Sequence, residues 1–331
     1  MKPLQSYWYS RSPLPWLLLP LAALFGLLAA LRRYGYSKGY LAVKRFALPV
    51  IVVGNISVGG TGKTPLVIWL VERLRQAGYR PAVVSRGYGG EPHMQPRAVN
   101  AQSSAQSVGD EPLLIARRCG CPVVVCTDRA LAVEHLLAQG NCNVVVADDG
   151  LQHYRLGRDI EIAVIDGERR FGNGLLLPAG PLREPQRRLK SVDLIVVNGQ
   201  SAEPGECAMQ LEARALFSLT DQPQRPLADY KGCTVHAVAG IGNPHRFFDD
   251  LRRHGLTVIE HPFPDHYAYT AGELCFDDAL PVLMTEKDAV KYQHGATEQH
   301  WFLAVDAVID ASFSQRLLTR LAAVEKSLKE V

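Results

Sequence analysis

The chain has 331 residues, of which 47% are hydrophobic and 21% charged, so it can form a large packed core and is not a disordered protein. Its length predicts two domains or one large domain. The net charge of +3 is unevenly spread, because the first 71 residues hold eight basic side chains and no acidic one. A basic arm on a mildly acidic body predicts an anionic partner surface, and the apolar run within the arm favours a membrane over nucleic acid.

This apolar run covers residues 12–31 and carries no charged side chain. As a helix, residues 14–31 would span about 27 Å, close to the roughly 30 Å thickness of a bilayer core. Aromatic side chains flank the run on both sides, and five basic residues follow it within residues 32–45, against two before it. The positive-inside rule then places the body of the chain in the cytoplasm. We therefore predict a membrane-anchor helix with a basic collar over residues 1–45.

Two other interpretations of this segment are open. A cleaved signal peptide is disfavoured, because Arg32 and Arg33 follow the run and no small-x-small cleavage site is present. A buried helix of a soluble protein is the second. The sequence does not separate an anchor that spans the bilayer from one that lies in a single leaflet. The seven cysteines are an odd number without Cys-x-x-Cys spacing, which predicts reduced, mostly buried thiols in a reducing compartment.

Residues 46–200 alternate between short apolar runs and helical patterns. Strands are predicted at 49–53, 82–84, 122–126, 144–147, 160–165 and 194–197, and helices at 64–76, 113–118 and 130–138. Residues 91–108 are polar and are expected to be irregular. Strands that alternate with helices predict right-handed crossovers and an α/β fold with a doubly wound, mostly parallel sheet.

The pattern changes near residue 200. Residues 199–231 are polar with scattered prolines, which indicates a linker with edge strands. Beyond it, strands are predicted at 235–239, 258–260, 282–285 and 302–305, and helices at 244–254 and 313–328. We therefore predict a nucleotide-binding core over residues 46–200 and a second, smaller α/β lobe over residues 201–331.

A glycine-rich segment, SVGGTGKT, lies between the first predicted strand and the first predicted helix of the core. Its glycines would let backbone N–H groups face a phosphate, with the positive end of the following helix beside them. Lys63 would reach the β- and γ-phosphates, and the Thr64 hydroxyl would bind magnesium. The predicted ATP-binding residues are therefore Ser57, Val58, Gly59, Gly60, Thr61, Gly62, Lys63 and Thr64.

This phosphate loop departs from the usual pattern at its first position, where Ser57 replaces glycine. It is also similar to the loops of partitioning ATPases, but those carry an early lysine where this chain has Val58. The simplest alternative is a glycine turn that binds no nucleotide. The strand and helix on either side favour the P-loop NTPase-like interpretation.

Two neighbouring carboxylates, Asp148 and Asp149, follow the apolar strand predicted at 144–147. In a P-loop fold such a strand ends near the phosphate loop, where a carboxylate can hold Mg²⁺ directly or through water. Side chains of neighbouring residues point in opposite directions, so one can bind the metal while the other orients a partner. The alternative is a solvated Asp-Asp-Gly turn.

Four further polar residues are candidates, although their patterns alone are ordinary. Asp110 precedes a predicted helix and could simply cap it, and Glu111 follows it. His266 lies in a loop after a short strand, where a lone histidine is usually a surface residue. Arg183 lies in a loop rich in proline and glycine that would suit anion recognition, or is an ordinary surface loop.

Taken together, these segments resemble one family, the tetraacyldisaccharide 4′-kinases, the lipid A 4′-kinases of Gram-negative bacteria. The resemblance rests on seven segments that occur in order: GNISVGGTGKTP (54–65), SRGYG (85–89), VGDEP (108–112), DDGLQH (148–153), LLPAGPLREP (176–185), FPDHY (263–267) and TEKDA (285–289). It implies a lipid kinase of lipid A biosynthesis that transfers the γ-phosphate of ATP to the 4′-hydroxyl of a tetraacylated glucosamine disaccharide 1-phosphate.

The same resemblance implies the roles of individual residues. Asp110 and His266 form a catalytic dyad, with Asp110 as the proton acceptor, and Lys63 and Mg²⁺ neutralise the transferred phosphate. Glu111 and Arg183 lie on the substrate side. A lipid acceptor stays in the membrane, so the expected location is the cytoplasmic face of the inner membrane.

Two other functions are alternatives to the kinase. A membrane-associated P-loop ATPase acting as a switch or partitioning factor would turn over ATP without a lipid. A nucleotide-binding membrane adaptor would bind without transferring phosphate. No nucleic-acid partner is expected.

Overall fold

The structure is a computed structural model and describes residues 7–10, 13–199, 203–220, 222–292 and 295–330. Its strands are β1 (Val50–Gly54), β2 (Pro81–Ser85), β3 (Arg97–Val99), β4 (Val123–Val125), β5 (Val144–Ala147), β6 (Ile160–Asp166), β7 (Leu194–Asn198), β8 (Glu206–Ser218), β9 (Thr234–Ala239), β10 (Thr257–Pro262), β11 (Val282–Thr285) and β12 (His300–Ile309). Its α-helices are α1 (Leu14–Leu17), α2 (Leu19–Ser37), α3 (Lys63–Gln76), α4 (Ala105–Val108), α5 (Asp110–Cys119), α6 (Arg129–Gln139), α7 (Pro244–Arg253), α8 (Glu286–Ala289) and α9 (Ala311–Lys329). Two short 3₁₀ helices, Gln186–Ser191 and Leu227–Tyr230, complete the described elements.

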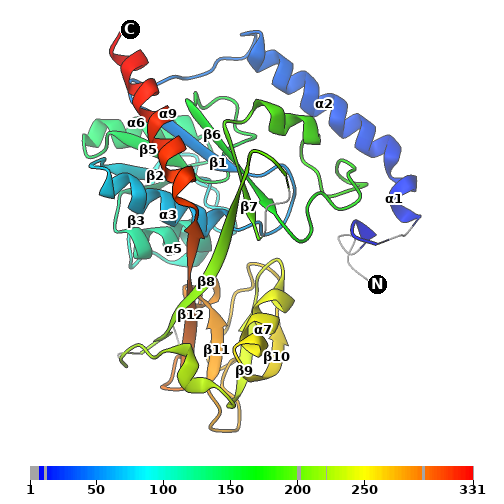
Figure 1. Cartoon of the computed structure of the whole chain (residues 1–331), viewed down its shortest axis with the longest axis vertical. Coiled ribbons are helices and arrows are strands. Elements are labelled where there is room, and N and C mark those ends of the chain that lie inside the picture. Colours follow the sequence, from blue (N-terminus) through cyan, green and yellow to red (C-terminus); the bar gives the residue numbers. More distant parts are fainter. Residues whose placement is uncertain (1–6, 11–12, 200–202, 221, 293–294, 331) are drawn as a thin grey trace.

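The described strands form one mixed sheet in the order β10-β9-β11-β12-β8-β7-β6-β1-β5-β2-β4-β3, which runs through two lobes (Figure 1). In the larger lobe β1 lies between β5 and β6 and is parallel to both. All five residues of β1 are buried, as expected for a parallel strand covered on both faces. The prediction of a mostly parallel α/β sheet is therefore confirmed, with antiparallel pairs at β8–β12 and β3–β4.

Helices cover both faces of the sheet in the larger lobe. On one face α3 and α5 pack apolar side chains such as Leu70 and Leu113 against Ile51 and Val53 of β1. On the other face Val133 and other side chains of α6 pack against a second cluster. The alternation follows from strand geometry, because successive side chains of a strand point to opposite faces.

Two long strands join the lobes. β8 and β12 pair antiparallel over most of their length, and Figure 1 shows them running from the larger lobe into the smaller one. β8 also pairs with β7, so it lies inside the sheet. The prediction that residues 199–231 are a linker with edge strands was therefore wrong for 206–218. Its polar residues alternate with apolar ones in a strand that is half-buried rather than fully covered.

The smaller lobe is built on β9, β10 and β11, which are parallel, and on α7. Its core includes Phe248 and Leu251 of α7, packed against strand residues such as Leu283. The last helix, α9, does not stay in this lobe. Phe313 of α9 packs against Trp69 of α3, with ring centroids 5.6 Å apart, so the C-terminal segment returns to the larger lobe.

The polar stretch 91–108 is more ordered than expected. It forms the short edge strand β3, which is antiparallel to β4, and the single-turn helix α4. Both elements are only a few residues long, so neither provides enough periodicity for a sequence pattern. All seven cysteines are free thiols, and four of them are buried.

The N-terminal helix α2 lies along the outside of the larger lobe (Figure 1). Leucines along it are 54–57% exposed, namely Leu21, Leu24, Leu27, Leu28 and Leu31. The helix touches the body at a few points: Arg33 donates a hydrogen bond to Ser191 Oγ at 3.2 Å. Within the described part of the chain, no helix combines the length and the apolar character needed to cross a membrane. The anchor over residues 1–45 stays a prediction, and residues 1–6 and 11–12 of it lie outside the described residues.

Candidate active site

The phosphate loop leaves the end of β1 and enters α3, as predicted. Gly59 and Gly62 have φ values of 101° and 93°, in the left-handed region that favours glycine. A Cβ at Gly62 would also lie only 2.6 Å from Nδ2 of Asn198. Asn198 Nδ2 donates to the Thr61 carbonyl at 3.2 Å, which fixes the loop against the end of β7.

The carboxyl ends of the parallel strands meet at one edge of the sheet, and the polar residues gather there. The loop follows β1, Asp148 follows β5, Ser85 ends β2 and Asn198 ends β7. This edge is where ligands bind in open α/β sheets, at points where neighbouring strands connect in opposite directions. The predicted nucleotide-binding residues are therefore placed together by topology.

The two neighbouring carboxylates have opposite surroundings. Asp149 Oδ1 lies 3.4 Å from Lys63 Nζ, and its Oδ2 lies 3.2 Å from Arg183 Nη1. Burial alone would raise the pKa of Asp149, but Lys63, Arg183 and Arg129 outweigh it and lower the pKa to about 2. Asp149 also has a φ of +47°, so its backbone is held in a conformation that is uncommon outside glycine.

Asp148 is 1% exposed, and its Oδ2 accepts a 3.4 Å hydrogen bond from Ser85. Burial, together with the nearby charges of Glu111 and Asp149, raises the pKa of Asp148 to about 7. Its Oδ1 is buried and finds no hydrogen-bond partner among the described residues. A buried carboxylate oxygen without a partner is a suitable ligand for a hard cation.

The described residues contain no group of three His, Cys, Asp or Glu side chains able to enclose a metal. Mg²⁺ in kinases and ATPases usually needs only one or two protein oxygens, because substrate phosphates and water complete its octahedron. Asp148 and the Thr64 hydroxyl beside the phosphate loop therefore fit such a cation. Asp149, in contrast, is already neutralised by two basic side chains.

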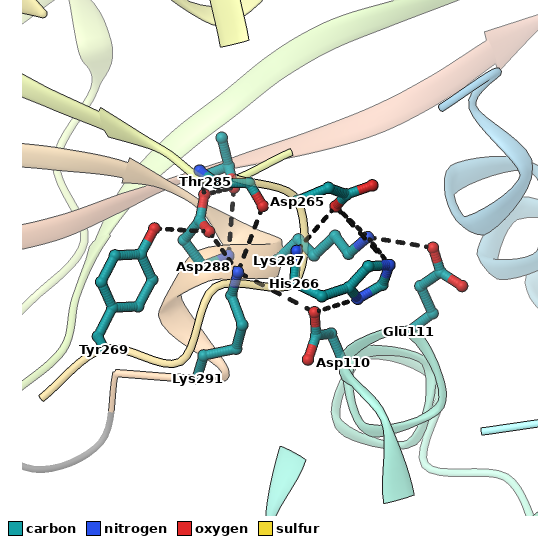
Figure 2. Close-up of polar contacts among 10 residues, drawn as sticks. Asp110, Glu111, Asp265, His266, Tyr269, Thr285, Lys287, Asp288 and Lys291 are labelled. Carbon is teal, nitrogen blue, oxygen red and sulfur yellow. Dashed lines mark hydrogen bonds and ion pairs between the residues drawn. The ribbon is translucent and has the colours of Figure 1, made fainter. Parts of the chain in front are cut away.

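Asp110 and His266 come from different lobes and meet across the space between them (Figure 2). Asp110 is the first residue of α5, and His266 lies in the loop after β10. His266 Nδ1 lies 2.9 Å from Asp110 Oδ2. The φ of His266 is +60°, and a Cβ at Gly89 would lie 2.6 Å from its Nδ1, so the SRGYG segment must have glycine there.

A second group of charged side chains lies beside this pair, and apart from Glu111 its members were missed by the sequence patterns. Lys287 Nζ donates to Glu111 Oε1 at 3.3 Å and to Asp265 Oδ1 at 3.1 Å (Figure 2). Lys291 Nζ lies 4.0 Å from Asp110 Oδ2. The resemblance contained the segment TEKDA but gave it no role. The only available signal was its position after a short apolar strand, where functional side chains often lie.

Further contacts place these groups in one site. Glu111 lies close enough to Asp148 to raise its pKa, so the pair on α5 and the pair after β5 belong to one site. A Cβ on Gly242, in the smaller lobe, would lie 3.2 Å from the backbone nitrogen of Gly60. A cavity of about 340 Å³ opens beside Asp110 and His266.

Comparison with known proteins identifies the family. Residues 14–322 match the family model of tetraacyldisaccharide-1-P 4′-kinases, LpxK. The chain is 51% identical over 320 residues to the tetraacyldisaccharide 4′-kinase of Nitrosococcus oceani, covering 97% of this chain and 94% of that protein. It is 52% identical over 337 residues to the enzyme of the same name from Alkalilimnicola ehrlichii, covering 97% and 98% of the two chains.

A solved structure shares the fold. The chain superposes with a TM-score of 0.79 and 29% sequence identity on the crystal structure of the "apo" form of LpxK from Aquifex aeolicus in complex with ATP, covering 93% of this chain and 99% of that one. The resemblance inferred from the seven segments is therefore confirmed over nearly the whole length. The chain belongs to the tetraacyldisaccharide-1-P 4′-kinase family.

Proposed function

We propose that this chain is the ATP-dependent kinase that phosphorylates the 4′-hydroxyl of a tetraacylated glucosamine disaccharide 1-phosphate. The observation that carries the proposal is the 2.9 Å contact between Asp110 and His266, beside the carboxylates and the phosphate loop at one edge of the sheet. An ATPase switch or partitioning factor has no need of an acid–base pair facing an acceptor. Membership of the tetraacyldisaccharide-1-P 4′-kinase family also argues against that function.

ATP binding is assigned to residues 46–200 and above all to the loop Ser57–Thr64. Its backbone N–H groups and the N-terminus of α3 would hold the β- and γ-phosphates, and Lys63 would add a positive charge next to them. In the described state Lys63 contacts Asp149, so an incoming triphosphate would compete with that carboxylate. Arg183, which contacts the same carboxylate, would then face the transferred phosphate or the acceptor.

Mg²⁺ would be held by Thr64 and Asp148, with Asp149 as a neighbouring charge. When bound with ATP, Mg²⁺ neutralises charge on the β- and γ-phosphates. Asp148, at the end of β5, offers a buried carboxylate oxygen that has no hydrogen-bond partner among the described residues. This oxygen would be available to the cation.

Asp110 would take the proton of the acceptor hydroxyl as its oxygen attacks the γ-phosphorus. The new bond forms between the 4′-oxygen and phosphorus, the bond to the β,γ-bridging oxygen breaks, and ADP leaves. His266, in the smaller lobe, would orient Asp110 and adjust its basicity. Glu111 would lie next to the acceptor, and the rest of the acceleration would come from positioning and charge neutralisation.

The acceptor is a lipid, so the kinase must work at a membrane surface. The exposed leucines of α2 offer an apolar face for one leaflet, and Arg32 and Arg33 at its C-terminal end would meet anionic head groups. We propose that α2 holds the chain at the cytoplasmic face of the inner membrane. This arrangement needs no helix that crosses the bilayer.

Phosphate transfer tests this function directly. ATP labelled in its γ-phosphate is incubated with the protein, Mg²⁺ and the disaccharide lipid, and a parallel reaction contains the same lipid lacking the 4′-hydroxyl. Label should appear on the first lipid only. Label that ends in inorganic phosphate at the same rate with either lipid would show an ATPase instead.

A further inference from the structure

Lys287 is the one charged group of this site that contacts both lobes and also faces the ring of His266, among the residues that the structure describes. Its Nζ lies 3.5 Å from Nε2 of His266, while it donates to Glu111 in the larger lobe and to Asp265 in the smaller one (Figure 2). Its side chain is 17% exposed. The ammonium group is therefore held on the side of the imidazole opposite to Asp110.

This ammonium group keeps its charge. Burial alone would lower the pKa of Lys287, but Glu111, Asp265 and Asp110 outweigh burial and raise the pKa above its ordinary value. A lysine ammonium has three N–H donors and no acceptor. Any ring nitrogen in contact with it must therefore act as the acceptor.

We infer that Lys287 is a positioning residue that, together with Asp110 on the opposite side of the ring, holds His266 in its Nδ1–H tautomer. A neutral imidazole carries one proton, so an acceptor at Nε2 leaves that proton on Nδ1. Nδ1–H then donates to Asp110 Oδ2, and the carboxylate stays an acceptor. The other carboxylate oxygen of Asp110, Oδ1, contacts neither His266 nor Lys291 and is left for the acceptor hydroxyl. This inference rests on the proposed role of Asp110 as the proton acceptor.

The other charged groups around the ring agree with this assignment. Asp265 Oδ1 lies 3.7 Å from Nε2, beyond hydrogen-bond distance, and accepts instead from Lys287 and from the backbone N–H of His266, both at 3.1 Å. Lys291 lies on the other side of Asp110, 4.0 Å from its Oδ2, and does not contact the ring. Tyr88 packs its ring edge-on against the imidazole, with centroids 4.9 Å apart, and adds no charge.

A buried network holds Lys287 in place. Thr285 accepts a hydrogen bond from the backbone N–H of Asp288 and so caps α8, the turn that carries Lys287. The Asp288 carboxylate is fully buried and accepts from Gly240 N at 3.0 Å, Tyr269 Oη at 2.9 Å and Lys291 Nζ at 2.7 Å. Since Asp288 is fully buried and the groups around it are paired with it, α8 has little freedom to move the lysine away from the ring.

Nitrogen NMR of the imidazole tests the inference without relying on activity. The full-length protein is labelled with ¹⁵N-histidine and measured in detergent at about pH 8, well above the ordinary histidine pKa of about 6.5. His266 is assigned among the ten histidines by its loss in a His266→Gln spectrum. Wild-type protein should show Nδ1 as the protonated, pyrrole-type nitrogen and Nε2 as the unprotonated, pyridine-type nitrogen. A wild-type spectrum with the proton on Nε2 would overturn the inference, whether or not any variant folds.

Three variants separate the effect of Lys287 on the imidazole from a general loss of contacts between the lobes. Lys287→Met removes the donor at Nε2 while Asp110 still accepts from Nδ1–H, so the pyridine-type Nε2 resonance should move toward that of a nitrogen without a hydrogen bond. It should also lower kcat by about tenfold or more, with KM for ATP nearly unchanged, because acid–base positioning acts on the chemical step. Lys287→Arg keeps donors at Nε2 and should keep the Nδ1–H tautomer. Arg118→Gln removes the contacts that Arg118 makes from α5 to Glu286 and Asp306, yet should leave the tautomer unchanged.

The outcomes are distinguishable from failure of the proposed function. An unchanged Nε2 resonance in Lys287→Met, or the same change of that resonance in Arg118→Gln, would contradict the positioning role of Lys287. If instead Asp110→Asn left lipid phosphorylation intact, the proposed base would fail, while the tautomer assignment of His266 would stand on its own spectrum.

Discussion

Lys63 Nζ lies 3.4 Å from Oδ1 of Asp149, and the guanidinium of Arg183 contacts the other oxygen of that carboxylate. The lysine of the phosphate loop is thus paired with a carboxylate. A triphosphate carries more negative charge than one carboxylate, so it can draw both basic groups away from Asp149. In this structure Asp149 holds Lys63 and Arg183 side by side.

Replacing this lysine should weaken nucleotide binding. Lys63→Met removes one charge-assisted contact to phosphate, worth about 1.5–3 kcal/mol, which corresponds to a roughly 10- to 100-fold weaker affinity for ATP. Isothermal titration measures the affinity directly. Lys190→Met, at an exposed position, is the matched control and should bind ATP like the wild type. An unchanged affinity in Lys63→Met would remove Lys63 from the phosphate site.

The buried carboxyl of Asp148 should make stability depend on pH. Its folded-state pKa of about 7 lies above the reference value of 3.8, so the folded state binds its proton more tightly than the unfolded state does. The stabilisation is therefore complete below about pH 4 and is lost as the pH rises through about 7. Urea unfolding should show wild type losing stability between about pH 5 and pH 8 relative to Asp148→Asn. Parallel curves for the two proteins would contradict the raised pKa.

The same proton competes with the metal. A protonated Asp148 cannot bind Mg²⁺, so the stabilisation given by Mg²⁺ with ATP should be larger at about pH 8 than at about pH 6. In Asp148→Asn this difference should disappear. Thermal shift at fixed ATP and Mg²⁺ concentrations measures it, with ATP and EDTA as the metal-free control. A pH-independent shift in wild type would argue against Asp148 as a metal ligand.

The exposed face of α2 should control attachment to lipid. Leu24→Gln combined with Leu28→Gln removes two apolar side chains that are 54% and 57% exposed, without disturbing the buried Ala22. Binding to vesicles that contain anionic lipid should fall about tenfold or more, since each buried leucine contributes about 1.5–3 kcal/mol. Leu137→Gln, at a partly exposed position on α6, is the control and should bind normally. Equal sedimentation of all three proteins would place the membrane contact elsewhere.

Local sequence was enough to predict the parts of the site that are contiguous in the chain. The phosphate loop and the pair after β5 each follow an apolar strand, and parallel strands bring their carboxyl ends to one edge. The sequence could not predict which of Asp148 and Asp149 pairs with basic side chains and which is buried with a raised pKa. These differences depend on a left-handed backbone at Asp149 and on basic groups brought from distant segments.

Contacts between lobes were the least predictable from the sequence. Asp110 and His266 are 156 positions apart, and only the family resemblance paired them. Lys287 is a further 21 positions along, and nothing in its local pattern points to a histidine ring. β8 was missed because it is a long, half-buried strand with many polar residues, a pattern that is also typical of a linker. Its pairing with β12 cannot be inferred from its own sequence.

The return of α9 to the larger lobe can be tested by stability. Phe313 is fully buried against α3, so Phe313→Ala should lower the free energy of unfolding by about 3–5 kcal/mol. Thr319→Ala, on the exposed face of the same helix, should change it by less than about 0.5 kcal/mol. Urea unfolding measures both. Equal effects of the two substitutions would mean that α9 is not part of the packed core.

Single-turnover transfer in Asp110→Asn tests the whole site most directly. The amide keeps an oxygen that can accept from His266, but it cannot take a proton from the acceptor hydroxyl. With ATP, Mg²⁺ and lipid already bound, rapid quenching should show lipid phosphorylation slowed by about 10²- to 10⁴-fold, with ATP affinity unchanged. Transfer at the wild-type rate would contradict the assignment of Asp110 as the group that receives the proton.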